Sequence, residues 1–282
     1  MTWIVDTCLS PVILSVAKND KPFLGHAMRL SKANMFSMRK FALALFFTFA
    51  LCGRLFAGAP FLTDDPVPVD YQHWEFYLSA TGDRTSNSDT ISGPVFELNY
   101  GAAPETQLHL AVPVANVSTA GHAWTSGLGD AEFGIKYRFL QETDRRPQFG
   151  VYPAVELPTG SASRGLGNGR AWFRLPVWLQ KSYGPWTSFG GGGMALNSAP
   201  GQRNYGFGGW EVQRDFGPHF TLGAELFRQG ADTDADRGFT AANIGGDLNF
   251  TPNTSLLLST GRSFAGDHHT LWYLALYTTW GP

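Results

Sequence analysis

Polar and apolar side chains alternate strictly between Asp130 and Phe139. One parity holds charged residues and glycine. The other parity consists of Ala131, Phe133, Ile135, Tyr137 and Phe139. Because successive side chains of a strand point to opposite faces, this segment predicts a β-strand with one charged face and one aromatic face. The pattern leaves the orientation open, since a soluble exported barrel buries the aromatic face and a membrane barrel exposes it to lipid.

The same alternation recurs along the chain. We expect strands at 73–80, 96–100, 107–114, 130–139, 149–157, 172–180, 186–195, 210–213, 220–227, 240–250, 256–258 and 270–280. Short turns between them alternate with longer polar loops, of which 82–92, 116–129 and 158–169 are examples. An even strand number and this two-sided rhythm are typical of bacterial outer-membrane barrels, whose sheet must close in lipid. The sequence therefore predicts an all-β fold, a closed antiparallel up-and-down transmembrane β-barrel of about 12 strands.

The composition suits a β-rich protein that carries an export signal. The 282 residues include 33 glycines and 14% aromatic residues, and no apolar run approaches the ~18 residues of a spanning helix. An apolar run at 41–51 follows two basic residues and precedes a small-residue exit, which predicts a signal peptide at 38–57. Residues 1–37 would then be a non-native or mis-annotated extension, with translation starting at Met35 or Met38.

The segment after the predicted cleavage, 58–72, is rich in proline and aspartate. We expect a periplasmic lead-in arm there, ahead of an outer-membrane barrel at 73–282. The composition slightly favours a solvated arm, and the alternatives are that it caps the periplasmic mouth or partly enters the lumen.

Both cysteines, Cys8 and Cys52, fall in the leader, so the mature chain has no disulfide and must be stabilised otherwise, as a closed barrel is. The leader also holds seven of the 21 basic residues and two of the 23 acidic ones, which leaves a net charge of about −7. That charge argues against a nucleic-acid partner.

Three basic side chains orient the barrel if it lies in a membrane. Lys136, Arg138 and Arg174 would each cost roughly 2–4 kcal/mol on the lipid face at mid-depth, so their parity should face the lumen. The lumen-facing set predicted in this way consists of Glu97, His109, Asp130, Glu132, Lys136, Arg138, Glu156, Trp172, Arg174, Trp178, Glu211, Gln213, Glu225 and Asp247. These charges could satisfy one another or guide a substrate, and the two tryptophans could stack on an aromatic solute or fill space.

Catalytic and metal chemistry finds little support in the sequence. Asp232, Asp234 and Asp236 are spaced like the start of a calcium loop, but the expected glycine comes one place late, which makes this a weak candidate. His268 and His269 are adjacent on an extended chain and point apart. There is no Gly-x-Ser-x-Gly motif. We expect no enzymatic activity, no resident metal and no cofactor.

Four short segments carry a resemblance to a known family. These are Leu157–Gly160, Gly165–Gly169, Leu222–Leu226 and Trp280–Gly281. They resemble the outer-membrane β-barrels grouped with the meta-pathway of phenol degradation, over most of the mature chain. The motifs are moderately specific, since they are glycine-rich strand ends.

The resemblance implies a channel or transporter in the outer membrane of a Gram-negative bacterium that passes small, aromatic or hydrophobic molecules. Its partners would be outer-membrane lipid, the barrel-assembly machinery and a small-molecule solute. No catalytic residues carry over from the family. One departure is that Trp280 is followed by two further residues, which displaces the aromatic terminus read by the assembly machinery. The alternatives are a soluble exported lipocalin-like ligand-binding barrel and a non-conducting structural barrel.

Overall fold

The computed structural model describes residues 59–119 and 122–282. The predicted N-terminal extension, signal peptide and translation start lie outside these residues. The strands are β1 (Trp74–Thr85), β2 (Ser88–Ala103), β3 (Thr106–Thr119), β4 (Thr125–Leu128), β5 (Ala131–Leu140), β6 (Gln148–Val151), β7 (Ala154–Leu157), β8 (Trp172–Tyr183), β9 (Trp186–Leu196), β10 (Tyr205–Asp215), β11 (Phe220–Gln229), β12 (Phe239–Thr251), β13 (Thr254–Gly266) and β14 (His269–Trp280), with a 3₁₀ turn, η1 (Ala162–Arg164). Within this part of the chain no helix has the length and apolar character needed to cross a membrane.

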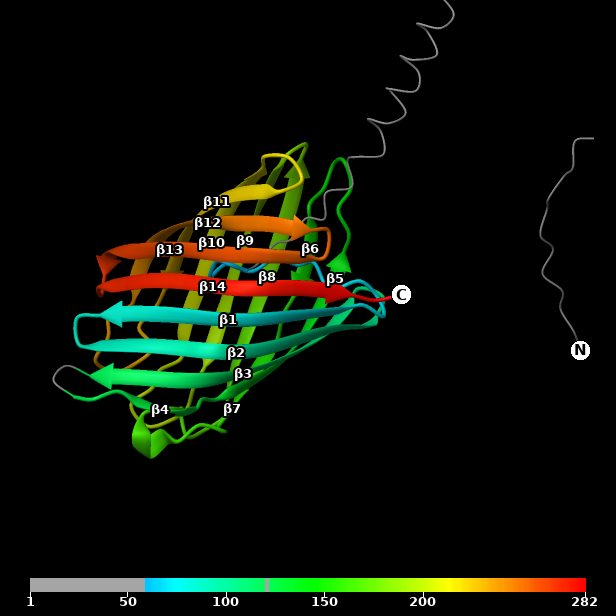
Figure 1. Ribbon diagram of the computed structural model, residues 1–282. Coiled ribbons are helices and arrows are strands. Elements are labelled where there is room, and N and C mark those ends of the chain that lie inside the picture. The colour runs from blue at the N-terminus through cyan, green and yellow to red at the C-terminus, as the bar shows by residue number, and fades with distance from the viewer. Residues whose placement is uncertain (1–58, 120–121) are drawn as a thin grey trace, which may run out of the picture. The chain divides into compact units, whose positions relative to one another are not determined.

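The strands form one closed antiparallel sheet (Figure 1). β1 pairs with β14 along its whole length, from Trp74 opposite Trp280 to Thr85 opposite His269. β4 and β5 both pair with β3, and β6 and β7 both lie between β5 and β8. Each of these two pairs therefore makes one interrupted wall strand, and the wall has twelve positions. This confirms the prediction of a closed antiparallel barrel of about twelve strands.

The outer surface of the barrel is apolar. In β11 the alternate residues Phe220, Leu222 and Leu226 are exposed, whereas Thr221 and Glu225 between them are buried. The same alternation exposes large apolar side chains around the whole ring, far beyond the patch of a few hundred Å² usual for a soluble monomer. This surface is suited to contact with hydrocarbon.

Arg214 and Arg228 are outward-facing arginines near strand ends. Arg214 is one residue from the end of β10, and its guanidinium lies over the rings of Trp186 and Phe216 at 5.2 and 4.9 Å. Arg228 is one residue from the opposite end of the barrel wall and donates a hydrogen bond to Thr240 at 3.3 Å. These are the heights at which long cationic side chains reach a membrane–water interface.

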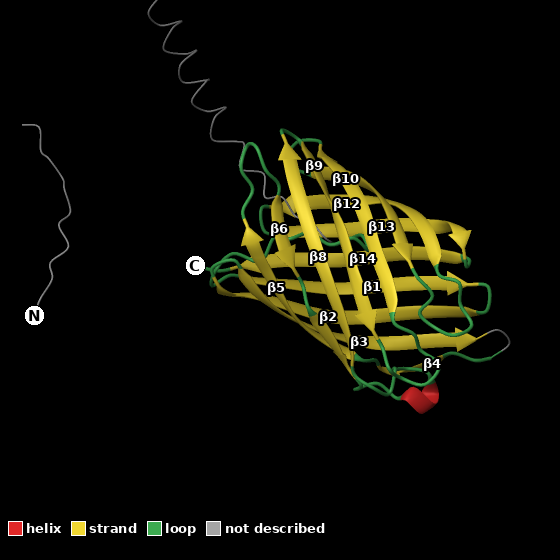
Figure 2. Cartoon of the chain, turned by 180° about the vertical axis from the view of Figure 1, so that it is seen from behind, coloured by secondary structure: helices red, strands yellow, loops and turns green. Residues whose placement is uncertain are grey.

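The two ends of the barrel differ. We call the end where β1 begins and β14 ends the terminal rim, and the other end the loop rim. The terminal rim has the connections 104–105, 141–147, 184–185, 216–219 and 252–253. The loop rim has 86–87, 120–124, 158–171, 197–204, 230–238 and 267–268. Figure 2 shows η1, in red, within the longest of the loop-rim connections.

Three of the predicted polar loops are wrong in extent. The expected loop at 82–92 is mostly strand, because β1 and β2 continue to a two-residue turn at 86–87 that an Arg84–Asp89 ion pair of 2.7 Å supports. Asp267, His268 and His269, which the sequence places in a further loop, lie at a two-residue turn, 267–268, and at the start of β14. Much of 116–129 belongs to β3 and β4. Polar residues end the apolar band here but do not end the hydrogen-bonded sheet.

The expected solvated arm at the N-terminus is also wrong. Residues 59–72, which we call the inner segment, lie inside the ring of strands, where Figure 1 shows them in blue. Thr63 is 0% exposed and Asp65 1% exposed, and Val69 is buried too. The physical reason is that the polar inner wall offers partners for the amides and carboxylates of a proline-rich chain that cannot form a strand.

Candidate functional site

The inner segment is held at both sides of the lumen through its backbone. The carboxylate of Glu225, on β11, accepts hydrogen bonds from the N–H groups of Leu62, at 3.3 Å, and of Thr63. The amide oxygen of Gln107, on β3, accepts one from the N–H of Val69 at 2.9 Å. Because β3 and β11 lie half a turn of the ring apart, the segment crosses the barrel and narrows its passage.

An ion pair adds a third attachment. Lys136, on β5, donates a hydrogen bond to Asp64 at 2.9 Å and lies 3.7 Å from Asp65. The Lys136 ammonium is buried, as is Asp65. A buried cation with two carboxylates beside it fixes the segment in place, because separating them would leave charge uncompensated.

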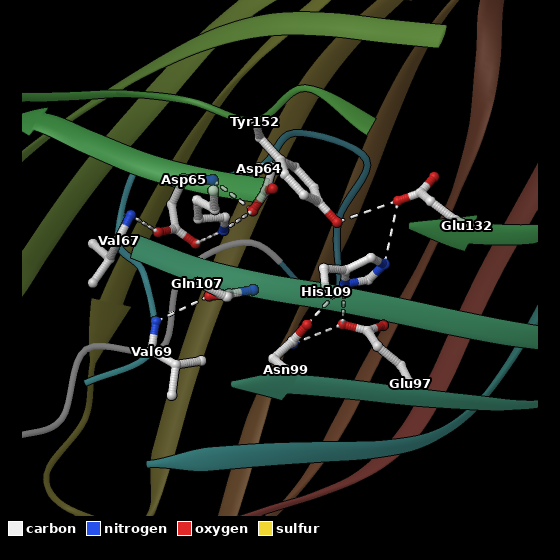
Figure 3. A network of polar contacts seen from close by, with 11 residues as sticks. Asp64, Asp65, Val67, Val69, Glu97, Asn99, Gln107, His109, Glu132 and Tyr152 are labelled. Atoms are coloured by element: carbon white, nitrogen blue, oxygen red, sulfur yellow. Dashed lines mark hydrogen bonds and ion pairs between the residues drawn. The ribbon is translucent and has the colours of Figure 1, made fainter. Parts of the chain in front are cut away.

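His109 is the centre of a polar network next to this attachment. Its Nδ1 lies 2.8 Å from Asn99 Oδ1 and 3.5 Å from a Glu97 oxygen, and its Nε2 lies 3.3 Å from Glu132 (Figure 3). The Tyr152 hydroxyl donates to Glu132 at 3.2 Å.

Glu132 is also the carboxylate that pairs with a sixth member of this network, Arg174 on β8. The predicted residues Glu97, His109, Glu132 and Arg174 are thus brought together from β2, β3, β5 and β8.

Two cavities divide the lumen. The terminal-side chamber, of about 280 Å³, is lined by polar and ionised side chains that include Glu75, Glu97, Gln107, His109, Glu132 and Lys136. The loop-side chamber, of about 540 Å³, is lined by aromatic side chains that include Phe61, Trp178, Tyr205, Phe207, Phe227 and Phe239. Phe61, Asp64, Tyr152, Arg174 and Tyr273 line both. The chambers therefore meet where the inner segment crosses the barrel.

The aromatic wall of the loop-side chamber was missed in the sequence. Phe207, Phe227 and Phe239 belong to the parity that carries Glu211, Glu225 and other polar residues, so they face inward. Their rings form contacts with one another and with neighbours, with Phe227 and Phe239 6.4 Å apart between centroids. The signal that could have found them is that these aromatics all lie on the polar parity near the loop-rim ends of their strands.

Two further ring contacts extend this wall. The rings of Trp178 and Phe207 lie 6.3 Å apart, and those of Phe239 and His269 lie 4.1 Å apart. Trp178, one of the predicted set, is only 2% exposed and packs in the wall of the chamber. His269 in turn lies 2.9 Å from Asp83 across the β1–β14 pairing. The aromatic wall is thus continuous from β8 to β14.

Three predicted acidic residues lie on the inner face of neighbouring strands and line neither chamber. Glu211 is directly opposite Glu225 in the β10–β11 pairing, and Asp247 is on the neighbouring strand β12. All three are buried. Glu225 is hydrogen bonded to the inner segment and to Asn243.

The remaining predicted residues occupy different places. Gln213 is buried on β10, two residues from Glu211 toward the terminal rim and on the same face. Glu156 lies 4.0 Å from Arg174. Trp172 lies under the Arg174 guanidinium, 6.0 Å from its ring centroid. All of these side chains are on the inner parity of their strands.

Asp130 and Arg138 lie near the two rims, away from the chambers. Asp130 accepts hydrogen bonds from the N–H groups of Gly160, at 2.9 Å, and Asn168, at 2.6 Å, and so fixes the longest loop-rim connection. Arg138 donates to Gln148 at 2.8 Å and pairs with Glu105 at the terminal rim. Their contacts are structural ones.

The weak calcium candidate receives no support. Asp232 accepts a hydrogen bond from Gln229, Asp236 accepts one from Thr233, and Asp234 lies 3.8 Å from Arg203, so the three carboxylates have separate partners. Burial and the neighbouring Asp236 raise the pKa of Asp232 to about 6. Over residues 59–119 and 122–282, no three histidine, cysteine or acidic side chains gather in a way that could hold a metal ion.

Comparisons with known proteins give a fold likeness. No family model matches the sequence, and no curated protein matches it. The chain is similar in structure to an outer membrane channel from Pseudomonas putida F1, with a TM-score of 0.65 and 16% identity over 77% of this chain and 98% of that channel. It is also similar to the NanC porin, with a TM-score of 0.50 and 8% identity over 72% of this chain and 98% of the porin. At these identities the likeness establishes the barrel fold.

Proposed function

We propose that this chain is an outer-membrane channel of a Gram-negative bacterium that passes small aromatic or hydrophobic molecules. The observation that carries the proposal is the pair of chambers stacked inside a closed barrel whose outer surface is apolar. A pathway from the loop rim runs through the aromatic chamber, past the inner segment and out through the polar chamber. We assign no catalytic step to it.

The solute class follows from the loop-side chamber. Its volume of about 540 Å³ falls within the roughly 300–1,000 Å³ usual for small-molecule sites. Walls of phenylalanine, tyrosine and tryptophan favour flat apolar molecules over hydrated ones, because stacking adds to the burial of apolar surface. Two solved barrels of similar fold, described as an outer membrane channel and a porin, agree with transport.

Two finer statements belong to the same proposal. The resemblance to barrels grouped with the meta-pathway of phenol degradation supports an aromatic solute. Insertion would depend on the barrel-assembly machinery.

The test measures how fast solutes permeate membranes that contain the full mature chain. Reconstituted in proteoliposomes, it should let benzyl alcohol or toluene cross faster than protein-free membranes of the same lipid do, and it should give discrete conductance steps in planar bilayers. Repeated insertions without conductance or permeation would favour the non-conducting barrel. A product that is monomeric in water without detergent would favour the soluble ligand-binding barrel.

A further inference from the structure

The charges inside the barrel do not balance. The carboxylates on the inner wall and inner segment include Asp64, Asp65, Glu75, Glu97, Glu132, Glu156, Glu211, Glu225 and Asp247. The permanently charged bases beside the two chambers, among the described residues, are Lys136 and Arg174. Both are already engaged, Lys136 with Asp64 and Asp65 and Arg174 with Glu132. The interior therefore carries an excess of acidic groups.

Part of this excess has no hydrogen-bond donor. Glu211 is 0% exposed, and both of its carboxylate oxygens lack a hydrogen-bond partner in the described structure, as does Oδ1 of the buried Asp247. Glu211 is also directly opposite Glu225 in the sheet. Like-charged carboxylates that share a buried site stay ionised only when a cation accompanies them.

The amide oxygen of Asn243 and the hydroxyl of Thr63 are two further buried oxygens without a partner in this part of the structure. A side chain at Gly261 would overlap Asn243 Oδ1, and one at Gly209 would overlap Thr63 Oγ1, so both oxygens are closely enclosed. These oxygen atoms come from β10, β12 and the inner segment, and of them the Thr63 hydroxyl can also donate a hydrogen bond.

Asn243 lines the aromatic chamber, whereas Glu211, Glu225 and Asp247 line neither chamber. Phe227 is two residues from Glu225 on β11, and Phe207 is four residues from Glu211 on β10, on the same inner parity. Aromatic faces attract cations within about 6 Å of the ring centroid, and the attraction grows when water is excluded. An aromatic solute that carries a positive charge would therefore be attracted both to the aromatic rings and to the acidic groups.

We propose that the lumen is selective for cations, and that its preferred organic solutes are small ammonium ions with an aromatic or alkyl body. This inference rests on the proposed channel function and specifies the class of solute that the channel takes. Anions of the same size should be excluded, because the acidic excess raises their energy inside the barrel.

The first experiment measures ion selectivity. Under a KCl gradient across a planar bilayer, the reversal potential of the full mature chain should show K⁺ passing in preference to Cl⁻. The double variant Glu211→Gln, Asp247→Asn keeps the side-chain shapes, and its K⁺/Cl⁻ permeability ratio should fall by roughly fivefold, as expected for charges screened at close range. The control Asp144→Asn removes a carboxylate from an exposed turn and should leave the ratio unchanged.

The second experiment measures binding and does not require conduction. Calorimetric titration of the protein in lipid nanodiscs should detect benzyltrimethylammonium more strongly than benzyl alcohol, and phenylacetate least. The double variant should weaken binding of the ammonium ion by roughly fivefold and leave benzyl alcohol unaffected. Phe207→Leu should weaken binding of the ammonium ion as well, because a cation–π contact is lost.

The outcomes separate this inference from the channel function. A preference for Cl⁻, or the same K⁺/Cl⁻ permeability ratio in the wild type and the double variant, would overturn cation selectivity. Either result would leave the channel function standing. Equal binding of benzyltrimethylammonium and phenylacetate would overturn cation selectivity as well, and would indicate that protons neutralise the carboxylates. Charge-selective binding without any conductance would support the cation site and contradict the channel.

Discussion

The ammonium of Lys136, on a wall strand, donates a hydrogen bond of 2.9 Å to Asp64, on the segment that crosses the lumen. The two residues are 72 positions apart in the sequence, and their ion pair joins the inner segment to the barrel wall. The rest of the segment is held mostly by backbone groups, at Glu225 and Gln107. Of these three attachments, the ion pair is the one in which both partners are side chains.

Replacing the lysine should loosen the inner segment. Lys136→Met removes the positive charge but fills similar space, and it leaves Asp64 and Asp65 without their partner. Breaking a buried pair in this way costs about 3–5 kcal/mol when the remaining charge stays buried. The inner segment would avoid this cost by moving its unpaired carboxylates into water. We expect larger and more frequent conductance steps in planar bilayers, with the barrel still resistant to unfolding on unheated gels.

The matched control is Lys181→Met. Lys181 forms an ion pair of 2.8 Å with Glu142 at the terminal rim, outside the chambers. Its replacement should leave single-channel conductance unchanged. If Lys136→Met conducts as the wild type does, the ion pair does not hold the segment in the passage.

A disulfide should lock the same segment. A side chain at Gly209, on β10, would overlap the hydroxyl of Thr63, so cysteines at both positions would have Cβ atoms close enough to bridge. The sequence has two other cysteines, Cys8 and Cys52, and both fall within the predicted leader. We expect Thr63→Cys, Gly209→Cys to form the bond under mild oxidation and to hold conductance at its low level until a reductant is added. Thr63→Cys with Gly217→Cys, in an open turn of the terminal rim, should not cross-link.

Much of the fold was predictable because the alternation is a local signal. Segments such as Asp130–Phe139 assign their two faces without knowledge of any neighbour, and closure follows from the need to pair every edge strand. The inward orientation of Lys136 and Arg174 follows from the cost of placing a charge in lipid. The same reasoning failed at 82–92, because polar composition marks where the apolar band ends and not where strand pairing ends.

The contents of the lumen were less predictable, since they depend on contacts distant in sequence. Residues 59–72 bind to walls more than 30 positions away, and nothing in their composition distinguishes a solvated arm from a buried one. Phe207, Phe227 and Phe239 each lie among the polar, inward-facing residues of their own strands. Only the folded barrel shows that the three side chains come together. Asp130 lies on the charged face, yet its carboxylate accepts hydrogen bonds from the backbone of the loop at 158–171.

The aromatic contacts of the loop-side chamber should limit the size of the passage. Phe227 is buried against Phe239 and Ala241 on the inner wall. Phe227→Ala should widen the chamber, and removal of a buried phenylalanine typically costs about 3–5 kcal/mol of stability. We expect faster permeation of two-ring solutes such as 1-naphthol in proteoliposomes. Phe250→Ala, at a position that is 59% exposed, removes the same ring from the outer surface and should not change permeation.

The ion pair at the terminal rim should make stability depend on acid. Glu105, in the turn between β2 and β3, bonds to Arg138 and to Gln141, and the Arg138 guanidinium holds the pKa of this carboxyl below its ordinary value. Because the folded protein favours the ionised form, the contribution to stability is complete above the ordinary glutamate pKa and is lost as pH falls through the lowered one.

The measurement is the thermal unfolding of the wild type and of Glu105→Gln in detergent at a series of pH values. Taking the difference between the two removes the titration of every other group. The wild type should be the more stable protein at neutral pH, by less than about 1 kcal/mol because the pair is partly exposed to solvent. The difference should shrink as the solution is acidified, and it should be smaller in high salt. A difference that stays constant from neutral to acidic pH would mean that Arg138 stabilises the turn without the charge of Glu105.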